Sequence, residues 1–402
     1  MSKYCVMNWD FLIKNKTSLQ VSTDTRNLPI GCVFFALHGL NFDGNKFAKQ
    51  ALQQGAYLAI IDDPEYTQPE GTLLVPDTLL ALQELARAWR RELGIPIIGV
   101  TGTNGKTTTK ELLAAVLSTK YNIHYTQGNL NNQIGVPLTL LQLTRIHEMA
   151  IVEMGASHPG DIRELVDIAE PNCGLITNVG RAHLEGFGSF EGVQKTKKEL
   201  YDYLRDHQGF IFRNIDNPYL AQMAGNLETV SYTTGTLPLG THLVGDYNAE
   251  NVSAAICVGE YFGVSNEQAL RAICQYVPTN NRSQQMQTAK NHLVVDAYNA
   301  NPTSMQAAIN SFEGDTYILG AMRELGDYTH LEHQNVVNML AERKADLVYL
   351  VGEEYHLTTS PYPIFNTVEE LHDYLVINPV KDRKILLKGS RSTKMEKLLD
   401  VL

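Results

Sequence analysis

The sequence contains few of the features that mark secreted, membrane-spanning or nucleic-acid-binding proteins. Its five cysteines are scattered over 402 residues and form no CxxC pair, which argues against a disulfide framework and a zinc site. We expect them to be buried thiols in a reducing compartment. No apolar run approaches the roughly 20 residues that a membrane-spanning helix needs. Residues 1–10 have no basic segment followed by an apolar one, so no signal peptide is predicted.

Positive charge is also scarce. The chain has 33 lysine and arginine residues against 44 aspartate and glutamate residues, a net charge of −11. This balance argues against a general binder of nucleic acid, although a local cationic pocket for phosphates is compatible with it. A cytoplasmic protein that binds no nucleic acid and has no membrane span fits these observations, and a monomer is expected, although the sequence does not reveal the oligomeric state.

The length and the order of the expected elements predict several α/β domains. A chain of 402 residues exceeds one ordinary core. Hydrophobic periodicity predicts strands at 30–38, 56–62, 95–100, 150–154, 174–178, 292–297, 316–319, 346–351 and 384–387. It predicts helices at 46–54, 78–93, 107–119, 161–169, 190–204, 248–262, 266–276, 304–312, 331–344, 368–375 and 394–401. Because strands alternate with helices, mostly parallel sheets are expected, in domains at 1–80, 81–290 and 291–402.

A glycine-rich turn lies between the strand expected at 95–100 and the helix expected at 107–119. It is Gly99-Val-Thr-Gly-Thr-Asn-Gly-Lys-Thr-Thr108, in the setting that a phosphate loop requires. Its backbone N–H groups and the helix N-terminus would hold phosphates, while Lys106 reaches the β- and γ-phosphates and the Thr107 hydroxyl binds Mg²⁺. A turn without a ligand is the alternative. The residues expected to bind ATP here are Thr101, Gly102, Thr103, Asn104, Gly105, Lys106, Thr107 and Thr108.

Further motifs follow in order along the chain. They are Glu153-Met-Gly-Ala156, Thr177-Asn-Val-Gly180, Ala182-His-Leu184, Gln194-Lys-Thr-Lys-Lys-Glu-Leu200 and Gly245-Asp-Tyr-Asn248. With Thr-Gly-Thr-Asn-Gly-Lys-Thr in the phosphate loop, they resemble the Mur ligases and the related folylpolyglutamate synthases. The resemblance extends over nearly the whole chain through Asp24-Thr-Arg26, Asp43-Gly44, Gly128-Asn-Leu-Asn-Asn-Gln-Ile-Gly135, Asp296-Ala-Tyr-Asn-Ala-Asn-Pro302 and Lys388-Gly-Ser-Arg391. The chain departs from residues common in the family at Asn45, Tyr247 and Ala321.

The resemblance implies a three-domain α/β enzyme. Its parts would be a small N-terminal α/β UDP-binding domain, a central P-loop ATPase domain with a mostly parallel sheet, and a C-terminal Rossmann-like domain. It also implies ATP-dependent amide formation through an acyl phosphate, because a free carboxylate must be activated before an amine can attack it. The C-terminal motifs resemble those of the family member that adds D-alanyl-D-alanine (D-Ala-D-Ala) to UDP-MurNAc-tripeptide in peptidoglycan synthesis.

The resemblance also implies catalytic residues and two Mg²⁺ ions. The catalytic residues would be Lys106, Glu153, His183 and Lys197. Thr107 and Glu153 would hold the first ion together with phosphate oxygens, which are ligands that Mg²⁺ prefers. Glu153, His183 and Lys197 would hold the second, with Lys197 carbamylated, because an ammonium group cannot bind a metal. A solvated surface lysine is the plain alternative for Lys197.

Other polar residues are expected to bind the substrates. Asn248 and Asn251 lie three apart, on one helix face, and would bind adenine, or else cap a helix. Asp296 would accept from ribose hydroxyls, unless it is an ordinary turn or helix-capping aspartate. Arg282 would clamp the γ-phosphate unless it forms a surface ion pair. The resemblance assigns the UDP-linked substrate to Asp24, Thr25, Arg26, Asp43, Gly44, Asn131 and Asn132. A carboxylate of the dipeptide would lie near Tyr298, Asn299, Asn301, Lys388 and Arg391.

Two other functions compete with this hypothesis. A folylpolyglutamate synthase shares the central and C-terminal layout but begins directly with its ATPase domain, so the first 80 residues favour a UDP-linked substrate. The second is a P-loop switch that hydrolyses nucleotide to drive a partner. That function would not explain why Glu153, His183 and Lys197 occur together. ATP turnover that requires both a carboxylate and an amine would separate a ligase from a switch.

Overall fold

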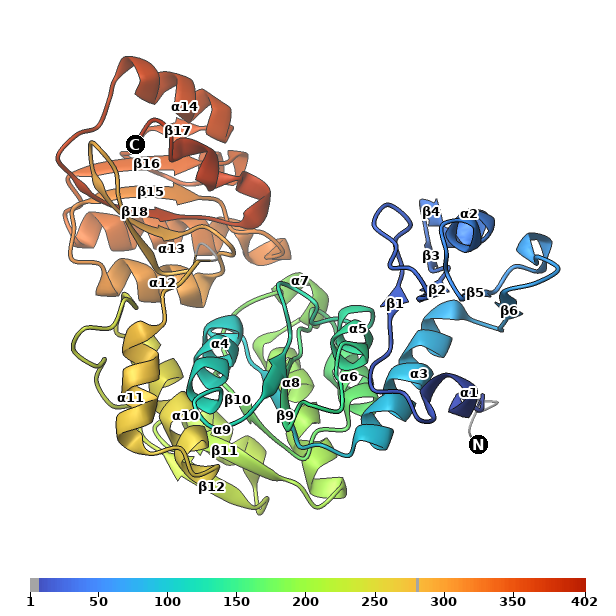
Figure 1. The fold of residues 1–402 in the computed structure, drawn as a ribbon. Helices are drawn as coiled ribbons and strands as arrows, with labels where there is room; N and C mark the ends of the chain where they lie inside the picture. The colour runs from blue at the N-terminus through green and yellow to red at the C-terminus, as the bar shows by residue number, and fades with distance from the viewer. Residues whose placement is uncertain (1–6, 280–281) are drawn as a thin grey trace.

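The chain folds into three α/β domains, and the N- and C-terminal domains lie at opposite ends of the central one (Figure 1). The computed structural model describes residues 7–279 and 282–402. The expected fold class is confirmed. The domain boundaries stay predictions, and the first strand of the C-terminal sheet, β13 (Gln284–Gln287), precedes the boundary expected at 291.

The N-terminal domain contains a small parallel sheet. Its strands lie in the order β1 (Val21–Ser22), β2 (Val33–Phe35), β5 (Leu58–Ile61) and β6 (Thr72–Leu74). The hairpin β3 (His38–Gly39) and β4 (Phe42–Asp43), the 3₁₀ turns η1 (Gly44–Phe47) and η2 (Pro64–Tyr66) and the helices α1 (Asp10–Ile13) and α2 (Ala48–Gln53) complete it. The strand expected at 30–38 is shorter, because residues 29–32 form a turn in which Cys32 N–H donates to the Pro29 carbonyl.

The central sheet has six parallel strands. Their order is β12 (Thr229–Tyr232), β11 (Phe210–Asn214), β10 (Cys173–Ile176), β7 (Ile97–Thr101), β9 (Met149–Glu153) and β8 (Ile123–Tyr125). The helices are α3 (Thr78–Leu93), α4 (Lys106–Leu117), α5 (Gly135–Leu141), α6 (Asp161–Ala169), α7 (Leu184–Phe187), α8 (Phe190–Asp206), α9 (Pro218–Ala224), α10 (Asn248–Tyr261) and α11 (Asn266–Gln275). Successive strand residues point to opposite faces, so Ile97 packs in one apolar cluster and Ile98 and Val100 in the other.

The C-terminal sheet is parallel except at one edge. Its order is β13, β14 (His292–Asp296), β18 (Lys384–Lys388), β15 (Thr316–Gly320), β16 (Leu347–Val351) and β17 (Ile364–Phe365), with β13 antiparallel to β14. The helices α12 (Pro302–Ser311), α13 (Thr329–Glu342) and α14 (Val368–Ile377) and the 3₁₀ turns η3 (Gly326–Tyr328) and η4 (Glu353–Leu357) cover it.

One predicted helix in this domain is wrong. Residues 394–401 form no α-helix; the 3₁₀ turns η5 (Arg391–Thr393) and η6 (Met395–Leu398) lie there instead. Lys394 has a left-handed φ of 52° and separates the two turns. The Lys397 N–H donates three residues back to the Lys394 carbonyl, as in a 3₁₀ turn.

The prediction that the cysteines are buried is correct for some of them and wrong for others. Cys32 and Cys173 are buried thiols as expected, whereas Cys257 and Cys274 are only half-buried, so the prediction is wrong for these two. Cys5 lies outside the described residues. Within the described chain, the structure contains no helix with the length and apolarity needed to span a bilayer.

A histidine pair lies beside the central sheet. The rings of His124 in β8 and His147 have centroids 5.4 Å apart. His124 Nε2 is buried and has no hydrogen-bond partner among the described residues. Burial lowers the pKa of His124 to about 4, and the neighbouring His147 acts in the same direction. The neutral imidazole is therefore the form that fits the folded protein.

Folding stability should decrease in acid because of His124. Its pKa is about 4 in the folded protein against an ordinary value of 6.5, so the unfolded chain binds the proton more tightly. The folded protein is therefore most stable above pH 6.5 and loses stability as the pH falls toward 4, by about 1–2 kcal/mol for a ring that is partly exposed. In urea unfolding, we expect the free energy of unfolding of His124→Gln to depend less on pH between 6.5 and 4 than that of the wild type. His242→Gln, which changes an exposed imidazole, should keep the wild-type dependence; equal slopes in the two variants would contradict the assignment.

Candidate active site

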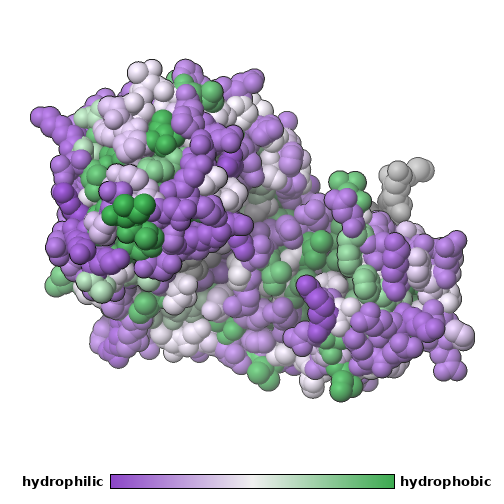
Figure 2. All heavy atoms as spheres, turned by 90° about the horizontal axis from the view of Figure 1, so that it is seen from above, coloured by the Kyte–Doolittle hydropathy of each residue, from purple (hydrophilic) through white to green (hydrophobic). Residues whose placement is uncertain are grey.

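A cavity of about 690 Å³ lies at the carboxyl ends of the central strands, and residues of the central and C-terminal domains line it. Parallel α/β sheets bind ligands at this edge. Seen from above, the surface between the two outer domains is hollowed, and hydrophilic residues cover most of this face (Figure 2). The predicted site residues that line the cavity are Thr103, Asn104, Gly105, Lys106, Thr107, Thr108, Asn131, Asn132, Glu153, His183, Asn248, Asn251, Arg282, Asp296, Tyr298, Asn299 and Lys388.

The phosphate loop between β7 and α4 is closely packed at two glycines. A Cβ atom on Gly102, whose φ is 145°, would lie 2.0 Å from Thr177 Oγ1. A Cβ atom on Gly105, whose φ is 76°, would lie 2.4 Å from Asn251 Oδ1. Only glycine fits both positions. The backbone of the loop therefore leads closely into the N-terminus of α4. At this end of the helix, the helix dipole favours an anion.

Lys106 folds back over this loop. Its Nζ donates to the carbonyls of Gly102 at 2.8 Å and Thr103 at 3.0 Å. Burial lowers the pKa of Lys106 to about 8, Glu153 opposes this shift, and the positive charge of Arg282 adds to it. The ammonium group is therefore poorly compensated, and phosphate oxygens would supply the missing negative charge.

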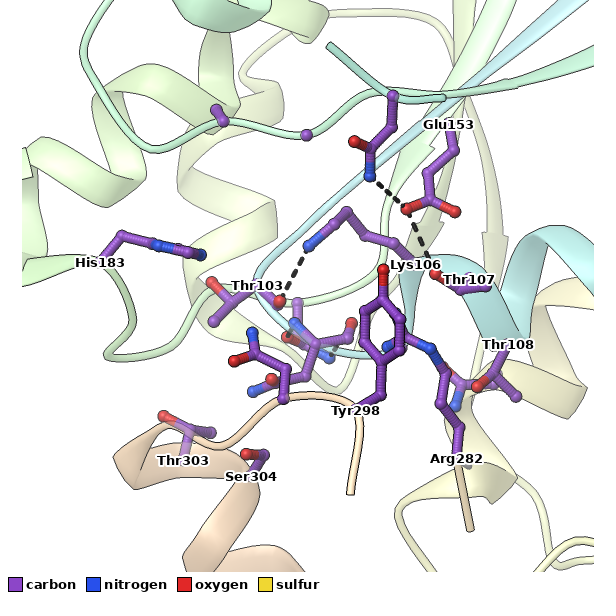
Figure 3. A pocket seen from close by; sticks show the side chains of 18 of the residues that line it. Thr103, Lys106, Thr107, Thr108, Glu153, His183, Arg282, Tyr298, Thr303 and Ser304 are labelled. Carbon is purple, nitrogen blue, oxygen red and sulfur yellow. Dashed lines mark hydrogen bonds between the residues drawn. The ribbon is translucent and has the colours of Figure 1, made fainter. Parts of the chain in front are cut away.

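Glu153 lies at the end of β9 with 1% of its surface exposed. Its Oε1 accepts from Thr107 Oγ1 at 3.2 Å and from Asn131 Nδ2 at 2.8 Å (Figure 3). Its Oε2 is buried and has no hydrogen-bond partner among the described residues. A buried carboxylate oxygen without a donor, next to a hydroxyl group, suits a hard cation such as Mg²⁺. The described chain contains no cluster of three or more His, Cys, Asp or Glu side chains that could bind a metal by themselves.

His183 and Lys197 do not yet form the second metal site that was expected. His183 lines the cavity, but its Nδ1 contacts Glu324 of the C-terminal domain. Lys197 is 2% exposed on α8, with Nζ 5.7 Å from the centre of the Phe187 ring. Burial lowers the pKa of Lys197, and the charge of Lys106 adds to this effect. A buried, readily neutral amine is the form that can react with CO₂, and a solvated surface lysine is excluded.

The two asparagines of α10 contact each other and the phosphate-loop helix. Asn251 Nδ2 donates to Asn248 Oδ1 at 2.9 Å, and Asn251 Oδ1 accepts from Thr109 at 3.0 Å. Asn248 Nδ2 donates to the Val244 carbonyl at 2.6 Å. Both are buried at the cavity wall. Much of their hydrogen-bonding capacity is therefore already used to hold α10 against α4.

Tyr298 lies between two arginines. The Arg282 guanidinium is 3.9 Å from the centre of its ring, and that of Arg391 is 5.5 Å away. Its ring points into the cavity beside Lys106 (Figure 3). Arg282 stacks on this ring and lines the same cavity as the phosphate loop. Its Nε is buried without a hydrogen-bond partner, and Arg282 forms no ion pair among the described residues. Arg391 is exposed.

Lys388 is not free to meet a substrate in this structure. It is 1% exposed, and its Nζ lies 2.5 Å from Asp296 Oδ2 and 3.2 Å from the Asn299 carbonyl oxygen. Asn301 lies outside the cavity lining, and its side chain contacts Asn104. Thr101 is buried beside Met154, to whose carbonyl its hydroxyl donates at 2.8 Å.

The residues expected to bind the UDP end lie apart from this cavity, except Asn131 and Asn132. Arg26 and Asp24 form an exposed ion pair with Nη2 and Oδ2 2.5 Å apart, and this hydrogen bonding lowers the pKa of Asp24 to about 2. Thr25 lies between them. The Asp43 side chain accepts from the Asn45 N–H, and a Cβ atom on Gly44 would lie 2.3 Å from the Leu37 carbonyl oxygen. Asn131 instead bonds Glu153, as described above.

Several residues of the site were not predicted from the sequence. Asn178 accepts from the Asn104 N–H at 3.0 Å, and Lys110 Nζ lies 4.0 Å from Glu153 Oε2. Glu324 contacts His183. Asn178 lies two residues after the end of β10 and within the Thr177-Asn-Val-Gly180 motif, so its place near a strand end could have identified it. Lys110 lies one helical turn after Lys106, which also places it on the same face of α4.

Comparison with known proteins identifies the class that this fold and site define. Family models match three consecutive segments: the Mur ligase family catalytic domain at 20–98, the Mur ligase middle domain at 100–236 and the Mur ligase glutamate ligase domain at 281–393. The chain belongs to the Mur ligase family.

Its similar relatives cover almost its full length. The UDP-N-acetylmuramoyl-tripeptide–D-alanyl-D-alanine ligase of Bacillus subtilis is 36% identical, over 94% of this chain and 92% of the relative. That of Escherichia coli is 34% identical, over 95% and 93%. MurF from Acinetobacter baumannii superposes with a TM-score of 0.84 at 30% identity, covering 95% of this chain and 92% of that one. MurF ligase from Thermotoga maritima in complex with ADP gives 0.85 at 27%, covering 96% and 98%.

Replacing Lys106 should remove activity without unfolding the protein. Lys106→Ala removes a cation from the phosphate loop, so we expect turnover of ATP to fall about 10²–10⁴-fold, with circular dichroism unchanged. Lys120→Ala, which removes an exposed lysine soon after the same helix, should keep wild-type turnover. Near-wild-type turnover in folded Lys106→Ala would overturn the assignment of the phosphate loop.

Proposed function

We propose that this chain is an ATP-dependent ligase that joins the terminal carboxylate of UDP-MurNAc-tripeptide to the amino group of D-Ala-D-Ala. The observation that carries the proposal is that one cavity brings the phosphate loop and Glu153 of the central domain together with Asp296 and Tyr298 of the C-terminal domain. Such a cavity suits a reaction in which a nucleotide and a second substrate must meet. Relatives similar over the whole chain act on these substrates by name.

The reaction requires activation of the carboxylate. A carboxylate oxygen attacks the γ-phosphorus of ATP, and the bond from this phosphorus to the β,γ-bridging oxygen breaks. ADP is the leaving group, and the substrate becomes an acyl phosphate. Lys106 and the loop N–H groups would balance the charge that moves onto the phosphate oxygens. The amine then attacks the acyl carbon, and inorganic phosphate leaves as the amide forms.

Mg²⁺ fits the residues around Glu153. The unpartnered Oε2 of Glu153 and the adjacent hydroxyl of Thr107 would hold one ion, and His183, Glu153 and carbamylated Lys197 would hold a second. Bound Mg²⁺ would neutralise phosphate charge and orient the substrate oxygens. His183 would have to leave Glu324 to take part.

The remaining substrates would occupy the outer domains. Arg391 is exposed, whereas Lys388 is paired with Asp296, so we assign the dipeptide carboxylate to Arg391, which can bind it through two parallel hydrogen bonds. The N-terminal domain, with Asp24 and Arg26, would hold the UDP end. We propose a monomer that acts in the cytoplasm, because the groups that line the cavity come from one chain and the proposed substrates are nucleotide-linked.

The amine substrate tests this function. Purified protein with ATP, Mg²⁺ and UDP-MurNAc-tripeptide should give the pentapeptide product with D-Ala-D-Ala, detected by mass spectrometry. In competition at equal concentrations, D-Ala, D-Glu and L-Lys should be used far less, because a cation placed for the dipeptide carboxylate selects by length. Preference for a single amino acid, or glutamate addition to a folate, would contradict this function and leave only a related ligase.

The buried amine of Lys197 gives a second test. Lys197→Ala should be severely impaired, and short carboxylic acids should partly restore its turnover because they can occupy the place of the carbamate. Lys195→Ala, which changes an exposed lysine two residues earlier, should need no rescue. Full activity of Lys197→Ala would exclude the second metal site.

A further inference from the structure

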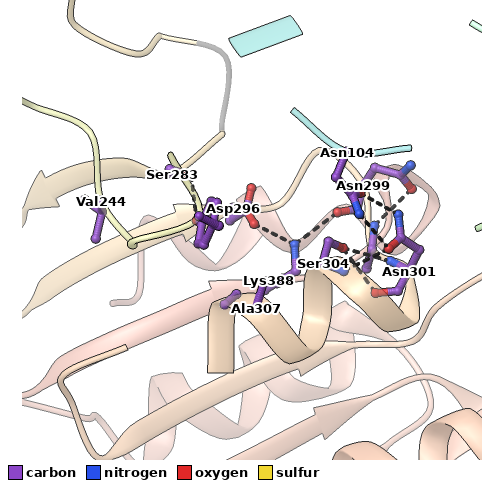
Figure 4. A network of polar contacts seen from close by, with 12 residues as sticks. Asn104, Val244, Ser283, Asp296, Asn299, Asn301, Ser304, Ala307 and Lys388 are labelled. Atoms are coloured by element: carbon purple, nitrogen blue, oxygen red, sulfur yellow. Dashed lines mark hydrogen bonds and ion pairs between the residues drawn. The ribbon is translucent and has the colours of Figure 1, made fainter. Parts of the chain in front are cut away.

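The phosphate loop and the C-terminal domain meet through two amide side chains. Asn301 Nδ2 donates to Asn104 Oδ1 at 2.8 Å, and Asn104 Nδ2 donates to Asn301 Oδ1 at 3.4 Å (Figure 4). The two residues are 197 positions apart in the chain. Because each amide both donates and accepts, the two hydrogen bonds form together only when these segments of the two domains lie side by side.

Asn104 and Asn301 are each held by hydrogen bonds outside the pair. On the central side, Asn104 N–H donates to Asn178 Oδ1 at 3.0 Å, and the Asn104 carbonyl accepts from Thr177 Oγ1 at 2.6 Å. On the other side, Asn301 caps the N-terminus of α12, where its Oδ1 accepts from the Ser304 N–H at 2.9 Å. Asn301 is 4% exposed. The backbone of Asn104 and the side chain of Asn301 are therefore already held in place by other contacts.

Lys388 braces the loop that carries Asn301. Its buried Nζ bonds Asp296 Oδ2 and the Asn299 carbonyl, at the beginning and the middle of residues 296–301. Asp296 lines the cavity, so one loop presents both a carboxylate to the cavity and an amide to the phosphate loop. The role that follows for Lys388 is to hold this loop in shape.

Other contacts dock the same two domains without reaching the phosphate loop. Arg181 N–H donates to Thr303 Oγ1 at 2.9 Å, and Arg181 Nη1 lies 2.9 Å from Glu332 Oε1. Within the described chain, the pair of Asn104 and Asn301 supplies the hydrogen bonds between the C-terminal domain and residues 99–108. Asn104 is two residues from Lys106, so movement of the pair moves the phosphate site.

We infer that Asn301 is a positioning residue that acts through Asn104 and couples nucleotide binding to docking of the C-terminal domain. The inference rests on the proposed function, since it requires that the loop binds nucleotide phosphates. A docked domain holds the loop in the shape that fits phosphates, and a filled loop in turn favours the docked domain. Such coupling is reciprocal by thermodynamic necessity.

The test is the affinity for ADP in the presence of Mg²⁺, measured by titration calorimetry without the other substrates. Asn104→Ala removes one amide, and Asn301→Ser removes the other but keeps an oxygen to cap α12. Each should weaken ADP binding about tenfold, the size expected for two hydrogen bonds. The double variant should bind ADP no more weakly than either single one. Asn217→Ser alters another helix cap, that of α9, and should bind ADP like the wild type.

The outcomes separate coupling from a purely structural role. Effects of the two single changes that multiply in the double variant, or wild-type affinity in Asn301→Ser, would overturn the inference. If Asn301→Ser folds poorly, Asn301→Thr, which also keeps a hydroxyl oxygen to cap α12 but has no amide to pair with Asn104, should show the same tenfold loss. Failure of the wild type to bind ADP would overturn the proposed function itself, and this inference with it.

Discussion

The buried carboxylate of Glu153 is the group on which the arrangement of the central domain depends. A carboxylate at 1% exposure must find donors or opposite charge within the protein. Thr107 and Asn131 donate to one oxygen, and Lys110, held at 2.8 Å by the Thr126 carbonyl, lies 4.0 Å from the other. These partners come from α4 and from the segment after β8. Satisfying Glu153 thus fixes the start of α4 beside the end of β9 and shapes the phosphate loop.

The same arrangement leaves one coordination position open. Lys110 is tied to the Thr126 carbonyl, so it compensates charge without occupying Oε2 of Glu153. The cavity then extends to the C-terminal domain, whose residues 296–301 lie over the phosphate loop. An acyl phosphate would be hydrolysed in bulk water, and a site enclosed by two domains limits this loss. The geometry therefore suits transfer to an amine better than simple nucleotide hydrolysis.

The features that were predictable from the sequence are local. The phosphate loop spans ten residues, and α3 and α6 begin and end where hydrophobic periodicity placed them. The helix at 394–401 was wrong because the segment folds as two short 3₁₀ turns, which the apolar pattern does not distinguish from an α-helix. Lys388 was expected to bind a substrate, yet it pairs with Asp296. Their contact follows from the pairing of β18 with β14. Which strands pair in a sheet cannot be predicted from the residues of either strand alone.

Activation of the carboxylate as an acyl phosphate is tested most directly by following the oxygen atoms of that carboxylate. UDP-MurNAc-tripeptide carrying ¹⁸O in its terminal carboxylate is turned over with ATP and D-Ala-D-Ala, and the inorganic phosphate is analysed by mass spectrometry. If the carboxylate is activated as an acyl phosphate, one carboxylate oxygen leaves with the phosphate, so each phosphate released from doubly labelled acid carries one ¹⁸O. Amide formation with unlabelled phosphate would contradict the account.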